Sequence, residues 1–148
     1  MESPTLSLFS TEIRNAGENM ATDLAMGEFL GPASPVALRF YGWSEPSISF
    51  GYFQKWDTVR KTLGKNLPNS VLRRPTGGGI VDHRYDLTFA LSFRRGTAFS
   101  EQKTTCLYEA IHTLLSEALN LLGENTSPSQ SAPFKQTSPS CFEAPVRS

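Results

Sequence analysis

The sequence predicts an α/β (α+β) domain built on a mixed, largely antiparallel sheet that packs with helices. Three observations lead to this fold class. Short segments alternate bulky and small residues, as strands do, and one long segment repeats its apolar residues at helical spacing. The chain has 148 residues, which is enough for one domain with its own core and few for two. The predicted order is helix, strand pair, loop, strand pair and helix.

The first predicted helix covers Asn19–Leu30, with the sequence NMATDLAMGEFL. Met20 and Leu24 fall on one face, and Asp23 is expected to stay in water. A short strand, Ala37–Tyr41, is expected to follow it.

Two further strands are predicted at residues 47–53 (SISFGYF) and 86–93 (DLTFALSF). Each has one bulky face, which needs a core, and one face of small residues. The small faces include Ser49, Gly51, Thr88 and Ala90. They leave room for a closely packed helix, which is the more common reason for such a face, or for an elongated ligand.

The strongest helical pattern covers residues 101–122. Ser100 is the expected N-cap and Gly123 the expected stop, and Cys106 should pack in the core. The apolar positions that keep the helical spacing are Leu107, Ile111, Leu114, Ala118 and Leu121. After this helix, residues 124–140 are rich in Ser and Pro and predict a flexible loop.

Composition excludes several classes of function. Fourteen basic residues balance 14 acidic ones, so no positive field is available to hold nucleic acid. Apolar runs are too short to span a membrane, and the first ten residues lack the positive charge of a signal peptide. Cys106 and Cys141 are therefore expected to be thiols in a cytoplasmic protein. No metal site is predicted.

The segment RRPTGGGIVDH, Arg73–His83, places two arginines before three successive glycines. Glycine amides without side chains can approach an anion directly, and guanidinium groups bind the same kind of ligand. The spacing fits neither a nucleotide P-loop nor a dinucleotide fingerprint. Residues alone leave two interpretations, a hairpin with a flexible tip or an anion cradle. His83 is either a structural hydrogen-bonding residue or a base, and the first is more common.

Four segments together resemble the lipoate-protein ligase and octanoyltransferase family, a cofactor-transferase group related to biotin ligases. They are NMATDLAM, LRFYGWSEPSISFGYFQ, RRPTGGGIVDHRYDLTFALSF and SCFEAP, and they cover nearly the whole chain from Asn19 onward. The resemblance implies a biotin/lipoate ligase-like domain that attaches a lipoyl or octanoyl group to one lysine of a lipoyl domain. The acceptors would be lipoyl domains of 2-oxoacid dehydrogenases or the glycine cleavage H protein. Acyl carrier protein would be the acyl donor of the octanoyltransferase branch.

The resemblance also implies roles for particular residues. The arginine–glycine segment would hold the acyl carboxyl or acyl-adenylate through Arg73, Arg74, Gly77, Gly78 and Gly79. The small strand faces would flank the acyl tunnel through Ser49, Gly51, Thr88 and Ala90. His83 would sit at the edge of the pocket.

Cys141 matches the acyl-accepting nucleophile of one octanoyltransferase branch, and a thiolate is suited to attack a carrier thioester. The ligase branch uses ATP and Mg²⁺ to activate lipoate and needs no nucleophile. The last three residues, VRS, resemble the arginine-containing pattern of that branch. A non-catalytic fragment that binds acyl-adenylate or a partner is the third alternative.

The chain departs from the family pattern in three places. Arg84 stands where an acidic residue usually follows the histidine, and Asp82 stands at an often apolar position. After Ser148 there is no counterpart of the family's segment with an essential lysine. Residues 1–148 are therefore expected to form a truncated, N-terminal portion of a single lipoyl/octanoyl transferase catalytic domain.

Overall fold

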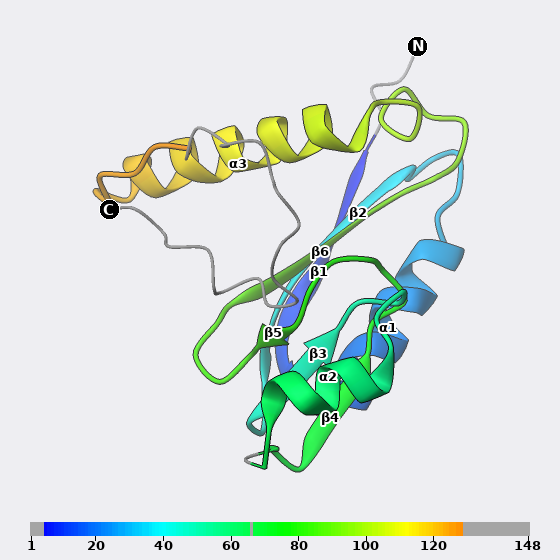
Figure 1. Cartoon of the computed structure of the whole chain (residues 1–148). Coiled ribbons are helices and arrows are strands. Elements are labelled where there is room, and N and C mark those ends of the chain that lie inside the picture. Colours follow the sequence, from blue (N-terminus) through cyan, green and yellow to red (C-terminus); the bar gives the residue numbers. More distant parts are fainter. Residues whose placement is uncertain (1–4, 66, 129–148) are drawn as a thin grey trace. The chain divides into compact units, whose positions relative to one another are not determined.

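The computed structural model describes residues 5–65 and 67–128 (Figure 1). These residues form two compact units that divide between Arg94 and Arg95. Among the described residues, two helices and six strands lie in the first unit and one helix lies in the second.

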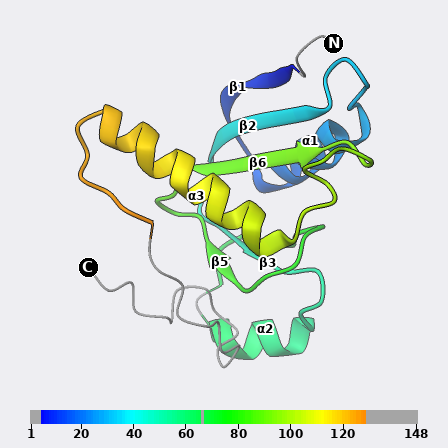
Figure 2. The same ribbon diagram turned by 90° about the horizontal axis from the view of Figure 1, so that it is seen from above.

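The first sheet, sheet A, consists of β1 (Leu6–Arg14), β2 (Val36–Trp43) and β6 (Thr88–Phe93). The central strand β2 runs parallel to β1 and antiparallel to β6. Helix α1 (Ala16–Glu28) contacts β2 and β6 and lies against this sheet in Figure 2.

Helix α1 begins earlier than the predicted Asn19 because Asn15 and Glu18 form a capping box. The Glu18 amide donates to Asn15 Oδ1 at 3.0 Å, and the Asn15 amide donates to Glu18 Oε2 at 3.3 Å. Each bond satisfies an amide that lacks a partner in the first helical turn.

The second sheet, sheet B, has the order β4 (Ser70–Arg73), β3 (Ser47–Phe50), β5 (Val81–Asp82). Strand β3 runs parallel to β4 and antiparallel to β5. Helix α2 (Trp56–Leu63) packs on this sheet, and its Val59 is 0% exposed. The core cluster of the unit is formed by Ile48, Phe50, Val59 and Ile80.

The expected mixed α/β architecture is confirmed, but the antiparallel majority is not. Among the described strands, two pairings are parallel and two are antiparallel. The sequence interpretation missed β1, where Ser, Thr and Glu interrupt the apolar alternation, and it also missed α2. Strand β1 is a parallel neighbour of β2, and α2 connects β3 to its parallel neighbour β4. These two missed elements account for the difference in strand direction.

The second unit contains α3 (Thr104–Leu121). Its N-cap is Lys103 and not Ser100, which instead closes a turn by donating through Oγ to the Thr97 carbonyl at 2.8 Å. Gly123 follows the helix with a φ of +94°, as the predicted stop requires. Cys106 is exposed, so the prediction that it packs in the core is wrong.

The apolar stripe of α3 explains this error, because helical spacing reports which residues share a face and not whether that face is covered. Leu114 and Leu121 of that stripe are exposed. Beyond the helix, the Thr126 amide donates to Asn120 Oδ1 at 2.8 Å, so the start of the predicted loop folds back on α3. Residues 129–140 of that loop lie outside the described residues. None of the helices in the described ranges is long and apolar enough to cross a membrane.

Candidate functional site

The glycine loop, residues 74–80, connects β4 to β5 across the end of β3. The Arg74 amide donates to the Phe50 carbonyl at 2.8 Å, and the Tyr52 amide donates to the Thr76 carbonyl at 2.9 Å. Strands β4 and β5 pair with β3 and not with each other. The loop is therefore not a simple two-strand hairpin, which removes one of the two interpretations that the residues had left open.

Gly51 and Gly78 hold this loop close to β3. A Cβ atom on Gly51 would lie 2.1 Å from the Gly78 carbonyl oxygen, so no larger residue fits without moving the loop. Gly78 has a φ of +98°, which side chains rarely adopt. Gly51 therefore serves backbone contact with the glycine loop.

Arg74 organises the inner side of the loop. Its Nη2 donates to the carbonyl oxygens of Gly79 at 2.8 Å and Gly77 at 3.2 Å. Its Nη1 donates to Ser49 Oγ at 2.6 Å. One guanidinium group thus ties two loop carbonyls to the strand beneath them.

Arg73 contacts different neighbours. Its Nη1 donates to the Tyr52 carbonyl, and its Cζ lies 5.0 Å from the centre of the Phe50 ring. Phe50 and Ser49 are successive residues of β3 and point to opposite faces. The two arginines therefore contact opposite faces of the strand, and this arrangement does not support a joint grip on one anion.

The outer side of the loop is open. Gly77 and Gly78 are exposed, and their amides donate no hydrogen bond to any residue in the described ranges. The Gly77 carbonyl already accepts from Arg74. The Gly77 and Gly78 amides remain as exposed N–H donors. Successive N–H groups in a turn form a concavity that suits an anion.

His83 is buried, with only 6% of its surface exposed, and its expected place at the edge of the pocket stays a prediction. Its Nε2 lies 2.6 Å from Ser49 Oγ, and its Nδ1 lies 2.7 Å from Asp86 Oδ2. Burial lowers the pKa of His83, the Asp86 carboxylate opposes that shift, and the Arg74 charge adds to it. The imidazole is therefore neutral at physiological pH.

Trp43 joins this group to sheet A. Its ring stacks on His83, with 3.9 Å between ring centres and 18° between planes. Its Nε1 donates to Thr88 Oγ1 at 2.8 Å, and Thr88 Oγ1 lies 3.4 Å from Asp86 Oδ1. Thr88 therefore helps to fix Asp86, and its expected place beside an acyl tunnel stays a prediction.

Ala90 lies on the same face of β6 as Thr88. In the antiparallel register Ala90 is opposite Arg39, and Thr88 is opposite Tyr41. Both Arg39 and Tyr41 bind side chains of α1. For Ala90 the small face therefore allows a closely packed helix, which was the more common of the two reasons considered.

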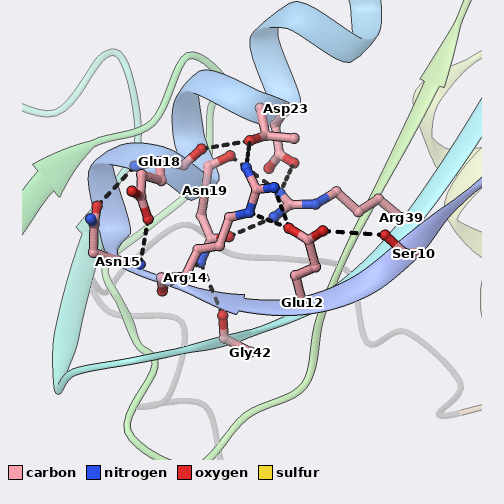
Figure 3. Close-up of polar contacts among 10 residues, drawn as sticks. Ser10, Glu12, Arg14, Asn15, Glu18, Asn19, Asp23, Arg39 and Gly42 are labelled. Atoms are coloured by element: carbon pink, nitrogen blue, oxygen red, sulfur yellow. Dashed lines mark hydrogen bonds and ion pairs between the residues drawn. The ribbon is translucent and has the colours of Figure 1, made fainter.

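A second polar cluster, shown in Figure 3, lies between α1 and β2. Arg39 is 2% exposed and donates to Asp23 Oδ1 at 2.9 Å and to Asn19 Oδ1 at 2.7 Å. Tyr41 donates its hydroxyl to Asp23 Oδ2 at 2.7 Å. Burial, followed by the neighbouring Asp23, raises the pKa of Tyr41. The expectation that Asp23 stays in water is wrong, because it neutralises this buried arginine.

Asp82 and Arg84, the two departures from the family pattern, pair with each other. Arg84 Nε donates to Asp82 Oδ2 at 2.8 Å and to Oδ1 at 3.0 Å. The Arg84 hydrogen bond lowers the pKa of Asp82. The acidic partner of His83 is Asp86, three residues further along, so the exchange at position 84 does not deprive the histidine of a carboxylate.

An open hollow of about 460 Å³ lies beside the loop in the same unit. Its apolar wall is made by Ile48, Leu63 and Ile80. Its other lining residues are Asp82 of β5 and, from the turn that follows, Arg84, Tyr85 and Asp86. Ile80 directly follows the glycine run, whereas the glycines themselves are not among the lining residues.

Asp86, Trp43 and Arg39 were absent from the sequence-based site. The spacing His83-x-x-Asp86 points to Asp86, and a lone charge between Leu38 and Phe40 in a strand points to Arg39. Cys141 lies outside the described residues, and its role stays a prediction.

Comparison with known proteins agrees with this fold. Residues 15–132 match the model of the lipoyl protein ligase A/B catalytic domain. An octanoyltransferase LipM of Moorella thermoacetica is 31% identical, with 98% of this chain and 55% of that protein covered. The corresponding protein of Anoxybacillus flavithermus is 32% identical, with 86% of this chain and 49% of that protein covered. The chain thus spans about half the length of these relatives.

Solved structures share the fold. A bi-partite lipoate protein ligase of Thermoplasma acidophilum, studied with its E2 lipoyl domain, is 25% identical with a TM-score of 0.60, and the match covers 88% of this chain and 49% of that one. A lipoate-protein ligase A bound with ATP is 26% identical with a TM-score of 0.56, and the match covers 82% and 48%. The family match over most of the residues, together with this shared fold, shows that the chain belongs to the lipoyl protein ligase A/B catalytic domain family.

Proposed function

We propose that the chain carries the acyl-binding part of an enzyme that attaches lipoyl or octanoyl groups to a lysine of lipoyl domains. Family membership supports the reaction class. The acceptors would be lipoyl domains of 2-oxoacid dehydrogenases or the glycine cleavage H protein, and a solved relative studied with an E2 lipoyl domain supports this choice.

One observation carries the proposal. The glycine loop turns the carbonyls of Gly77 and Gly79 toward Arg74, while the amides of Gly77 and Gly78 have no partner in the described chain. Amide donors beside a guanidinium group suit a carboxylate or the phosphate of an acyl-adenylate, because charge-assisted hydrogen bonds are the stronger ones. The acidic head of lipoate or octanoate would bind there.

In the first route the Cys141 thiolate attacks the thioester of an octanoyl carrier protein and expels the carrier thiol. The acceptor lysine amine then attacks the new thioester, forms an amide and releases the Cys141 thiol. The relatives that are octanoyltransferases LipM support this route.

In the second route ATP and Mg²⁺ activate lipoate as its adenylate, and no cysteine is needed. A structural relative bound with ATP supports this alternative. In a third alternative the chain binds acyl-adenylate, or a partner chain, without turnover.

Mass spectrometry after incubation with octanoyl carrier protein distinguishes the routes. The first route gives a thioester adduct that disappears in Cys141→Ser and persists in the matched control Cys106→Ser. The second gives lipoate- and Mg²⁺-dependent pyrophosphate release that Cys141→Ser retains. Thermal stabilisation by an acyl-adenylate analogue without either product indicates binding alone.

Glycine substitutions test the binding proposal itself. Gly51→Ala forces the loop away from β3, so we expect the Kd for a non-hydrolysable lipoyl-adenylate analogue to rise by about tenfold or more. Gly31→Ala is the matched control, because no atom lies within 4 Å of its added methyl group. Equal Kd values for both variants, measured by calorimetry, contradict the proposed location of the acid-binding site.

A further inference from the structure

A continuous chain of hydrogen bonds leads from the glycine loop into the protein. Arg74 Nη1 lies 2.6 Å from Ser49 Oγ, Ser49 Oγ lies 2.6 Å from His83 Nε2, and His83 Nδ1 lies 2.7 Å from Asp86 Oδ2. Ser49 is completely buried and His83 is nearly so. Neither residue has bulk water as an easy replacement partner.

The direction of each bond follows from the chemistry of the groups. A guanidinium group only donates, so the Ser49 oxygen accepts from Arg74. The same hydroxyl has one proton of its own, which it donates to His83 Nε2. That nitrogen must therefore be unprotonated, and the proton of the neutral ring sits on Nδ1, from which it is donated to the Asp86 carboxylate.

These contacts have the connectivity of a serine–histidine–aspartate relay, but Ser49 is poorly placed as a nucleophile. Its side chain has no exposed surface, and its oxygen already accepts from a positive group. A buried hydroxyl between a cation and a neutral imidazole is instead suited to transmit orientation.

On the basis of the proposed function, we propose that Asp86 and Ser49 are positioning residues that set the His83 tautomer and thereby hold Arg74 in register with the glycine loop. Without Asp86 the proton of His83 can move to Nε2. Arg74 and His83 would then both donate to the Ser49 oxygen, and the Ser49 proton would lose its acceptor. Arg74 would be freer to leave the carbonyls of Gly77 and Gly79.

The surroundings of His83 agree with a single neutral tautomer. In the described part of the chain, the charged groups that act on it are Asp86, Asp82 and Arg74, and Arg84 compensates Asp82 through their ion pair. The Trp43 ring covers one face of the imidazole. Asp86 is further oriented by Thr88 Oγ1, which lies 3.4 Å from its other oxygen.

Nitrogen-15 NMR of the imidazole tests the proposed His83 tautomer independently of any ligand. We expect wild-type His83 to be the Nδ1–H tautomer, Asp86→Asn to populate the Nε2–H form, and Asp82→Asn to leave the tautomer unchanged. Asp82 is the matched control because it lies one residue before His83 and receives its hydrogen bonds from Arg84. An Nε2–H tautomer in the wild type overturns the proposal.

Ligand binding tests the consequence for Arg74. For the lipoyl-adenylate analogue we expect Asp86→Asn and Ser49→Ala each to raise the Kd by about tenfold, and Ser49→Thr to recover part of that loss. Asp82→Asn should retain the wild-type Kd. Unchanged Kd values in both Asp86→Asn and Ser49→Ala contradict a positioning role.

Failure of the proposed function gives a different pattern. If the wild type binds neither lipoate nor the adenylate analogue, the assigned ligand is wrong, and the guanidinium signals of Arg74 still report its order. Slow guanidinium rotation in the wild type and Asp82→Asn, with fast rotation in Asp86→Asn and Ser49→Ala, supports the positioning chain. The same rotation rate in all four proteins overturns it.

Discussion

Two polar clusters of the first unit differ in where their hydrogen bonds end. The first, Asn19–Asp23–Arg39–Tyr41, closes on itself between α1 and β2. Figure 3 shows three of its members, Asn19, Asp23 and Arg39. The second, Arg74–Ser49–His83–Asp86, begins at the exposed glycine loop. The rings of Tyr41 and Trp43 connect them, with 5.8 Å between ring centres.

The difference shows how a structural cluster can be told from a functional one in the same core. In the closed cluster each charged group is neutralised by another member, so its removal should affect folding. In the second cluster the member at the loop, Arg74, donates to backbone carbonyls of a loop with unused amide donors. Its removal should affect the loop and its ligand more than the fold.

Replacement of the two arginines gives the largest expected contrast. Arg39→Ala leaves Asp23 charged and without its buried partner, so we expect a loss of about 3–5 kcal/mol in the free energy of unfolding. Arg74→Ala should lose less, because Arg74 is only partly buried, and it should weaken binding of the adenylate analogue more. Urea unfolding and calorimetry measure the two effects. Equal losses of stability, with equal Kd values, would remove the distinction between the clusters.

Acid should weaken the hydrogen bonds of the Arg74–Ser49–His83–Asp86 cluster before it protonates Asp82. Burial lowers the pKa of folded His83, whereas the unfolded residue titrates near about 6.5. As the pH falls below that value, the unfolded chain binds a proton that the folded chain excludes, so the free energy of unfolding decreases until the folded pKa is reached. His83→Gln should flatten this decrease just below about pH 6.5. Asp82→Asn should not, since the unfolded Asp82 titrates at about 3.8. A His83→Gln profile that keeps the wild-type slope just below about pH 6.5 contradicts the lowered pKa of folded His83.

A smaller effect is expected where the two sheets meet. Trp43→Phe keeps an aromatic ring against His83 and removes the donor to Thr88, so we expect a loss of about 1 kcal/mol. Trp56→Phe, the same change at the other tryptophan, should cost less than about 0.5 kcal/mol because that residue is exposed. Denaturant unfolding of both variants measures the difference. A larger loss for Trp56→Phe would mean that the Trp43 hydrogen bond does not stabilise the junction.

Periodicity was sufficient to locate β2, β3, β6 and α3, because these elements keep a clear apolar spacing. It was insufficient for β1, whose exposed Leu8 and Ile13 do not mark a buried face. Strand direction could not be predicted either. Strand β3 has β4 on one side and β5 on the other, and α2 lies between β3 and β4 in the sequence. The spacing of apolar residues does not reveal this arrangement.

For the site, the sequence placed Arg74, the glycines and His83 in one segment, and the structure brings them together with Ser49. The close approach of Gly51 to Gly78 depends on tertiary packing that residue spacing does not reveal. The same is true of Asp86 and Trp43, whose side chains meet His83 from a turn and from another sheet. Asp23 and Arg39 were missed because a buried ion pair cannot be identified from either partner alone.

Backbone amide NMR during titration with the lipoyl-adenylate analogue tests the central claim most directly. We expect the amide protons of Gly77 and Gly78 to shift downfield and saturate at the Kd found by calorimetry, and we expect Arg74→Ala to abolish the shift. Saturable binding that leaves both glycine amides unmoved, and shifts residues elsewhere in the chain, would contradict the claim that this loop grips the acidic head of the acyl ligand.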